Sequence, residues 1–139
     1  MTHYELPPKS GIVVTHFLTV ADVGRATRFY VDVLGGTLIR QKPAIVELAN
    51  TWVIMNVGGE PTDDKPAVTL CPPKNPDEAS NFMNIRVADV YAFYKDVKTR
   101  GALFLTEPKD HGAEIRCYMR DPDGYLIEVG QTTASGFER

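Results

Sequence analysis

The chain contains the same short stretch twice. Val20-Ala21-Asp22-Val23 returns 67 residues later as Val87-Ala88-Asp89-Val90. Both copies lie between an apolar run and a helix-like segment that ends in glycine. A repeat of this length marks two copies of one supersecondary unit. Because modules of about 60 to 70 residues are marginally stable alone, the sequence predicts two similar modules that form one domain.

The composition is that of an ordinary folded protein, with 43% hydrophobic and 24% charged residues. The net charge of -3 is spread along the chain and leaves no basic stripe, so we expect no nucleic-acid partner. The N-terminal residues resemble no targeting peptide, and no apolar run approaches the roughly 18 residues of a membrane span. Cys71 and Cys117 have no CxxC partner, which is typical of reduced thiols. These features favour a cytoplasmic protein with no membrane partner.

The first copy of the repeat reads as strand, helix and three strands. The β-branched run 11–20 is typical of a buried strand. Asp22 can cap the helix that follows, and Gly35-Gly36 can end it. Three short strand candidates complete this βαβββ unit. They span residues 37–40, 44–49 and 52–57.

The second copy has the same order. A strand is expected at 82–87, and Asp89 can cap a helix that ends at Gly101. Strands at 102–106, 114–120 and 125–130 follow, the last two joined by the turn sequence Asp121-Pro122-Asp123-Gly124. The predicted organisation is an N-terminal arm (1–10), a first module (11–71), a linker (72–81), a second module (82–131) and a tail (132–139).

Two motifs within this pattern resemble the vicinal oxygen chelate superfamily, the group of glyoxalases, bleomycin resistance proteins and extradiol dioxygenases. They are Phe29-Tyr30-x-Asp32-Val33-Leu34-Gly35 and Asp121-Pro122-Asp123-Gly124-Tyr125-x-Ile127-Glu128. The resemblance implies an α+β fold in which two βαβββ modules form paired half-barrels around a small-molecule site. It also implies a homodimer. Metal enzymes and metal-free binding proteins share this architecture, so the fold alone does not fix the reaction.

In metal-dependent members, ligands come from the opening strand of each unit, seven residues before the junction aspartate, and from the fourth strand. Glu128 matches the carboxylate ligand of the last strand by this resemblance. His16 lies six residues before Asp22, and Thr15 occupies the usual position. A bulge would be needed to turn His16 toward the site, and a packing histidine is the alternative. In the second unit the ligand position is Phe82, which cannot coordinate an ion.

Glu47 resembles the first-unit carboxylate of glyoxalase I, although the strand count places it on the third strand, where an exposed carboxylate is the alternative. The position equivalent to Glu128 in the first unit is expected at Met55 or Asn56. Three ligands, His16, Glu47 and Glu128, could still hold Ni, Zn, Mn or Fe(II) with open positions for two substrate oxygens. A protein without any metal is equally consistent with the sequence.

Six further residues are candidate ligand contacts. Strand alternation turns Arg86 and Arg116 toward polar faces, where either could anchor an anionic group, although surface arginines are the alternative. Asn84 shares the face of the second-unit ligand position. Phe17, Trp52 and Tyr118, together with Phe82, could line a pocket for a ring-bearing compound, although aromatic residues at strand spacing commonly belong to a core.

Two functions follow from the resemblance. The first is a glyoxalase-like protein in which a divalent metal assists lyase, isomerase or epimerase chemistry on a small oxygen-rich substrate, with Glu128 or Glu47 moving the proton. The alternative is a metal-free protein, similar to bleomycin resistance proteins, that sequesters an aromatic or cationic compound. In a third reading Glu128 is satisfied by local hydrogen bonds and the protein is an inert scaffold. The missing second-unit histidine disfavours an extradiol dioxygenase.

Overall fold

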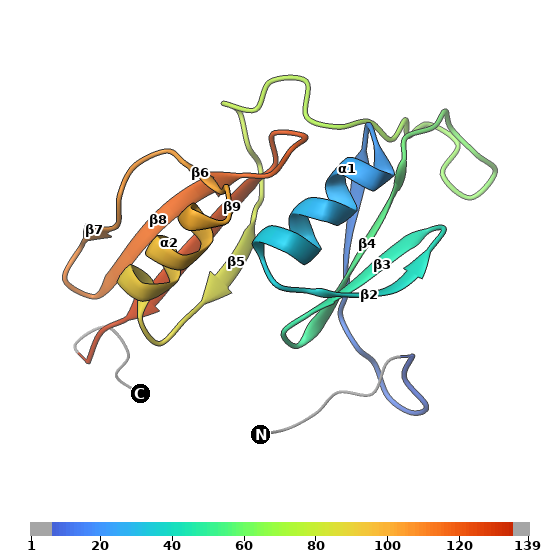
Figure 1. The fold of residues 1–139 in the computed structure, drawn as a ribbon. Helices are drawn as coiled ribbons and strands as arrows, with labels where there is room; N and C mark the ends of the chain where they lie inside the picture. Colours follow the sequence, from blue (N-terminus) through green and yellow to red (C-terminus); the bar gives the residue numbers. More distant parts are fainter. Residues whose placement is uncertain (1–6, 135–139) are drawn as a thin grey trace. The chain divides into compact units, whose positions relative to one another are not determined.

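The computed structural model describes residues 7–134. The chain forms two compact units, unit 1 (residues 1–72) and unit 2 (residues 73–139) (Figure 1). Unit 1 contains β1 (His16–Val20), α1 (Val23–Arg28), the π-helical segment η1 (Phe29–Val33), β2 (Thr37–Gln41), β3 (Ala44–Leu48) and β4 (Thr51–Val57). Unit 2 contains β5 (Met83–Arg86), α2 (Val90–Thr99), β6 (Leu103–Phe104), β7 (Lys109–Asp110), β8 (Glu114–Arg120) and β9 (Leu126–Thr132). The predicted α+β class is confirmed, and β7 is an addition to the predicted strands.

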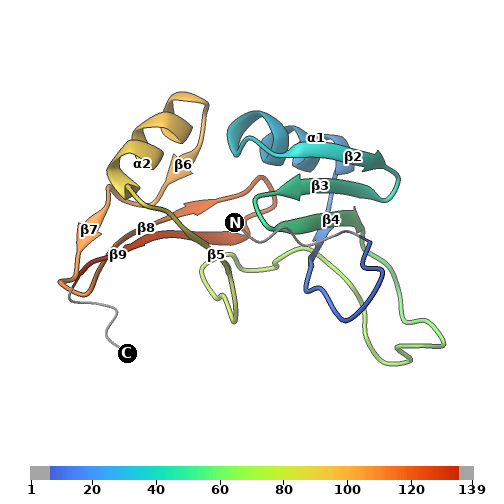
Figure 2. The same ribbon diagram turned by 90° about the horizontal axis from the view of Figure 1, so that it is seen from below.

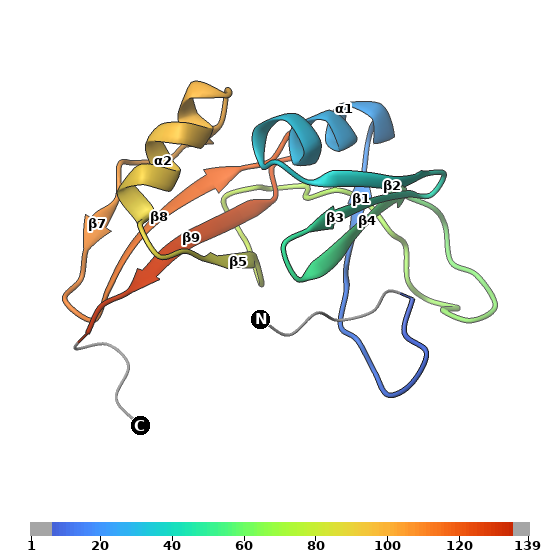
Figure 3. The same cartoon turned by 60° about the horizontal axis from the view of Figure 1, so that its bottom comes forward.

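The sheet of unit 1 has the strand order β1-β4-β3-β2, with β1 and β4 parallel (Figure 3). Register pairs Leu18 with Met55, and Val46 with Val53, so these side chains share one face of the sheet. All four are buried, as are Ala26 and Tyr30 of the helical segment. The core of unit 1 therefore lies between this face and the helix. We call the opposite face of the sheet the open face of unit 1.

The sheet of unit 2 has the order β5-β9-β8-β6, with β5 and β9 parallel and β7 paired to β8. Figure 2 shows α2 along one side of this sheet. The buried side chains of Ile127, Val129, Cys117 and Met119 alternate with the more polar residues of the same strands. This alternation gives unit 2 a second, polar face, which we call the open face of unit 2.

Both helices begin as the sequence predicts. The Asp22 side chain accepts a hydrogen bond from the backbone N–H of Arg25 at 3.0 Å, and Asp89 accepts one from Ala92 at 3.1 Å. Each carboxylate satisfies an N–H group that has no partner inside the first turn. The first helix differs from the prediction further along, because its regular part ends at Arg28 and a π-helical turn continues to Val33.

The predicted turn before β9 is also present. Asp121 Oδ1 accepts hydrogen bonds from the N–H groups of Asp123 and Tyr125, both at 2.9 Å, and Gly124 has a φ of 92°. This left-handed conformation suits glycine. The turn fixes the entry of β9 and thereby the register of Glu128.

Other boundaries differ from the expectations. The first strand begins at His16 instead of residue 11, and β5 begins one residue after Phe82. After β4, an isolated antiparallel bridge joins Gly59 and Leu70. Within residues 7–134, no helix has both the length and the apolar character needed to cross a membrane.

Candidate functional site

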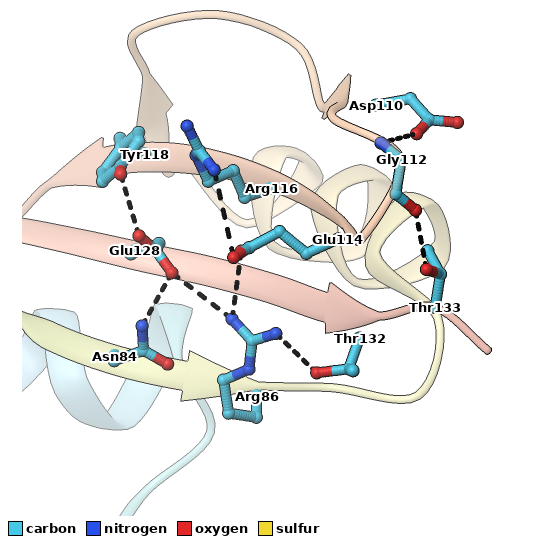
Figure 4. A network of polar contacts seen from close by, with 10 residues as sticks. All are labelled: Asn84, Arg86, Asp110, Gly112, Glu114, Arg116, Tyr118, Glu128, Thr132 and Thr133. Carbon is cyan, nitrogen blue, oxygen red and sulfur yellow. Dashed lines mark hydrogen bonds and ion pairs between the residues drawn. The ribbon is translucent and has the colours of Figure 1, made fainter. Parts of the chain in front are cut away.

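Glu128 lies in the middle of β9, between two buried apolar residues, and is 6% exposed. Its Oε1 accepts hydrogen bonds from Asn84 Nδ2 at 2.7 Å and from Arg86 Nη1 at 3.3 Å. Its Oε2 accepts one from the Tyr118 hydroxyl at 2.8 Å (Figure 4). A buried carboxylate requires a cation or strong hydrogen bonds, and Glu128 has both.

Strand register explains why these groups meet. Glu128 is the partner of Asn84 across β5 and of Tyr118 across β8, and Gly130 is the partner of Arg86 and Arg116. All of these residues therefore belong to the open face of unit 2. Asn84, Arg86, Arg116 and Tyr118, all predicted from the sequence as candidate ligand contacts, lie together on the face that carries Glu128.

The polar contacts continue beyond Glu128 along the same face. Arg86 Nη1 lies 3.4 Å from Glu114 Oε1, and Arg86 Nη2 donates to Thr132 Oγ1 at 2.8 Å. Arg116 Nη1 lies 3.9 Å from Glu114 Oε2. Sequence reasoning missed Glu114 and Thr132, although their two-residue spacing from Arg116 and Gly130 places them on this face. We call the connected set the Glu128 network: Asn84, Arg86, Glu114, Arg116, Tyr118, Glu128 and Thr132.

Burial and the Glu128 carboxylate raise the pKa of two side chains next to Glu128, Tyr118 and Cys117. Burial raises the pKa of Tyr118, and the hydrogen bond to Glu128 and the carboxylate charge raise it further. Tyr118 therefore stays a hydrogen-bond donor at neutral pH. Burial, followed by the Glu128 charge, also raises the pKa of the Cys117 thiol to about 11. Since the thiolate is the reactive form, Cys117 is an inert packing residue.

An aromatic pair borders the network. The rings of Phe82 and Tyr118 meet edge to face with their centroids 5.9 Å apart. Phe82 is 42% exposed. The open face of unit 2 therefore presents an accessible apolar ring beside a group of polar donors, a combination that suits a small molecule with a ring and oxygen substituents.

The open face of unit 1 has a different character. Register places Phe17 beside Ile54, and Ile54 beside Ile45, while Trp52 pairs with Glu47. Phe17 and Glu47 are exposed, and Trp52 is half-buried. Three of the expected site residues, Phe17, Glu47 and Trp52, thus share one face that is mostly apolar.

The first-unit counterpart of Glu128 is Ile54. Asn84 corresponds to Phe17 in the repeat, and the register partners of these two residues are Glu128 and Ile54. The expectation of Met55 or Asn56 was therefore wrong. Ile54 cannot coordinate an ion or move a proton, so unit 1 lacks the carboxylate that unit 2 carries at this point.

His16 lies on the other face of the unit 1 sheet. It pairs with Val53 and shares the helix-covered face with Leu18 and Met55. The ladder between β1 and β4 runs without the bulge that would turn His16 around. Phe17 and Glu47 point to the opposite face, so the structure does not bring His16 and Glu47 together as ligands of one ion.

Partial burial of His16 lowers its pKa and makes the stability of the protein depend on pH. Desolvation lowers its pKa below 6.5. The folded protein then binds this proton more weakly than the unfolded chain, so the stability contributed by neutral His16 is complete above pH 6.5 and falls as the pH drops below it. We expect His16→Gln to flatten the decline in unfolding free energy between about pH 7 and 5.

Urea denaturation across this pH range measures the effect, and His111→Gln, in an exposed loop, is the matched control. An unchanged pH slope in His16→Gln would show that His16 is not desolvated in the folded state.

The donors around Glu128 do not form a divalent-metal site. Among residues 7–134, no group of three or more His, Cys, Asp or Glu side chains is placed to hold a metal ion. The groups in contact with Glu128 are an amide NH₂, a guanidinium and a hydroxyl that donates its hydrogen. A guanidinium cannot ligate a cation and repels one, so this set does not fit the metal that the resemblance allows.

Comparison with known protein families shows to which superfamily the chain belongs. The model of the Glyoxalase/Bleomycin resistance protein/Dioxygenase superfamily matches residues 12–129. The chain belongs to this superfamily. Among curated glyoxalase-superfamily relatives, a protein named probable lactoylglutathione lyase from Synechocystis is 27% identical over 124 residues, covering 84% of this chain and 92% of that protein.

Solved structures of the superfamily share the fold. A glyoxalase/bleomycin resistance protein/dioxygenase from Nocardioides has a TM-score of 0.68 and 20% identity, covering 94% of this chain and 89% of that one. The fosfomycin resistance protein FosX from Listeria monocytogenes has a TM-score of 0.65 and 16% identity, covering 91% and 98%. At these identities the likeness shows the fold and leaves the activity open.

Proposed function

We propose that this glyoxalase-superfamily protein binds a small, oxygen-bearing ring compound on the open face of unit 2, without a metal ion at Glu128. The observation that carries the proposal is the Glu128 network itself. Its buried carboxylate is satisfied by protein donors, and the exposed Phe82 lies beside it. In this function the ring of the ligand packs on Phe82 and Tyr118, and its oxygen atoms accept hydrogen bonds from Arg86, Arg116 and Asn84.

Replacing Arg116 gives the most direct test of ligand binding. Its guanidinium is partly exposed on the open face, and its pairing with Glu114 is long, at 3.9 Å. We expect Arg116→Ala to weaken ligand binding about tenfold or more, because a hydrogen bond to a charged group contributes about 1.5–3 kcal/mol. Isothermal titration with a panel of small ring compounds that includes salicylate measures the loss. Arg100→Ala, which removes an arginine paired with Asp96 at the end of α2, is the matched control.

A second candidate function is a lyase or isomerase reaction, and the name of the Synechocystis relative, probable lactoylglutathione lyase, favours the lyase. In this function Glu128 or Glu47 moves the proton. Glu128 is the better placed of the two, because it lies on the polar face that carries Asn84 and Tyr118, whereas Glu47 lies on the mostly apolar face of unit 1. Turnover of lactoylglutathione by the purified protein, and its loss in Glu128→Gln, would support this candidate. A homodimer whose partner completes the site is compatible with either function.

Metal analysis separates the two proposals. We expect protein purified without chelator to contain far less than one equivalent of Ni, Zn, Mn or Fe, and added metal to leave the melting temperature unchanged. Elemental analysis and thermal melts with each ion provide the measurement. Near-stoichiometric metal that disappears in Glu128→Gln would overturn the metal-free proposal and favour a metal-assisted reaction.

A further inference from the structure

Gly130 of β9 lies directly beneath the guanidinium of Arg86. The two residues are register partners in the parallel pair of β5 and β9. A Cβ atom on residue 130 would stand 2.1 Å from Arg86 Nη1 and 2.9 Å from Arg86 Cζ. Those distances are shorter than any real contact of a Cβ atom, so the guanidinium occupies the space that a side chain would need. We call this space the Gly130 seat.

From the Gly130 seat, the guanidinium reaches both neighbours of Gly130 on the same face of β9. Nη1 lies 3.3 Å from Glu128 Oε1, and Nη2 lies 2.8 Å from Thr132 Oγ1. The same Nη1 atom lies 3.4 Å from Glu114 Oε1 of β8. One positive group therefore stands between two carboxylates, one of them buried, as Figure 4 shows.

We propose that Arg86, held on the Gly130 seat, is a fixed internal cation that stands where a divalent metal ion would otherwise neutralise Glu128 and Glu114. This inference rests on the proposal that the protein binds its ligand without a metal at Glu128. Arg86 is then a positioning residue, because it holds the Glu128 carboxylate toward Asn84 and Tyr118. It also leaves part of its own guanidinium, 41% exposed as a side chain, facing the ligand.

The chemistry of the contacts favours this assignment over an ordinary surface ion pair. A surface pair contributes little and needs no dedicated space in the neighbouring strand. Here the partner carboxylate is buried, and removing its cation leaves an uncompensated charge. Two carboxylates that approach one nitrogen atom also form the kind of oxygen pair that a hard divalent cation binds when the nitrogen is absent.

A double-mutant cycle tests the seat. Gly130→Ala is expected to displace the Arg86 guanidinium, which is the flexible end of its side chain, and to lower the melting temperature because the buried Glu128 carboxylate then loses its cation. In an Arg86→Ala background the same change is expected to be neutral or stabilising, because alanine is favoured over glycine within a strand once the space is free. An equal loss in both backgrounds would overturn the proposal, since the seat would then have no connection with Arg86.

Metal titration tests whether Arg86 takes the place of a metal ion. It measures Mn²⁺ binding, which would not change if Arg86 had only a structural role. Mn²⁺ is the probe, and free Mn²⁺ is measured by electron paramagnetic resonance. We expect no binding to the unaltered protein or to Arg86→Lys, and measurable binding to Arg86→Ala, which should disappear when Glu114→Gln is added. If Arg86→Ala does not fold, Arg86→Gln retains most of the side-chain volume and provides the same test.

The outcomes distinguish this inference from the proposed function. Mn²⁺ binding to the unaltered protein through Glu128 would overturn both. Absence of Mn²⁺ binding to the unaltered protein, to Arg86→Ala and to Arg86→Gln would overturn the internal cation alone, because ligand binding without a metal would be unaffected by that result. Binding that appears only when Arg86 is replaced would support the assignment.

Discussion

Replacing Tyr30 by alanine is expected to lower the free energy of unfolding by about 3–5 kcal/mol, the range found for truncating a large buried aromatic side chain. Tyr30 is fully buried, with 0% of its surface exposed, and its ring meets the Phe29 ring edge to face at 5.0 Å. Truncation removes this contact and leaves a cavity beneath the helix of unit 1. Since a typical domain is stable by about 5–15 kcal/mol, the loss would be a large fraction of the total.

Urea denaturation followed by circular dichroism measures the change. Tyr91→Ala is the matched control, because Tyr91 is 52% exposed on α2 and its truncation is expected to shift stability by about 0.5 kcal/mol or less. A Tyr30→Ala protein as stable as Tyr91→Ala would contradict the position of Tyr30 in the core.

Gly58→Ala is expected to destabilise unit 1 by about 1–3 kcal/mol, the usual effect of adding an atom where there is no space. A Cβ atom at residue 58 would stand 2.2 Å from the backbone oxygen of Leu70 and 3.2 Å from Thr19 Cγ2. Backbone cannot rotate away as a flexible side chain can, so the segment that carries Leu70 must shift. This shift would disturb the bridge in which Gly59 N–H donates to Leu70 O at 3.0 Å and Leu70 N–H donates to Gly59 O at 2.9 Å.

The neighbouring glycine supplies the control for this prediction. A Cβ atom at Gly59 meets nothing within 4 Å, and both hydrogen bonds of the bridge use backbone atoms that alanine retains. Thermal melts of the two variants are expected to show a large fall for Gly58→Ala and little change for Gly59→Ala. Similar melting temperatures would indicate that residues 58 and 70 lie further apart than the structure places them.

Local sequence signals predicted the framework well. Asp22 and Asp89 cap their helices, and the turn at 121–124 leads into β9, because each depends on a side chain that bonds to backbone a few residues away. The faces of the unit 2 strands also followed from the two-residue alternation. Asn84 and Arg86 lie on the face of Glu128 for this reason.

The candidate site was less predictable because its contacts cross the sheet. Alternation shows which face a side chain occupies, but not which partner a long arginine reaches. The counterpart of Glu128 was misplaced because the repeat distance is not constant. Asn84 and Phe17 are 67 positions apart (84 − 17), whereas Glu128 and Ile54 are 74 apart (128 − 54). The longer loops between α2 and β9 account for the difference, and sequence matching near the junction could not reveal it.

Gly130 offers a criterion for sorting relatives of this protein. An arginine at the position of Arg86 can place its guanidinium where Arg86 does, directly over the last strand, when its register partner is glycine, because a Cβ atom there would overlap this position of the guanidinium. A relative that has the arginine but a larger residue at the second position must direct that arginine elsewhere. The pair of positions, read together in an alignment, would therefore separate superfamily members that share this charge arrangement from members that merely share the fold.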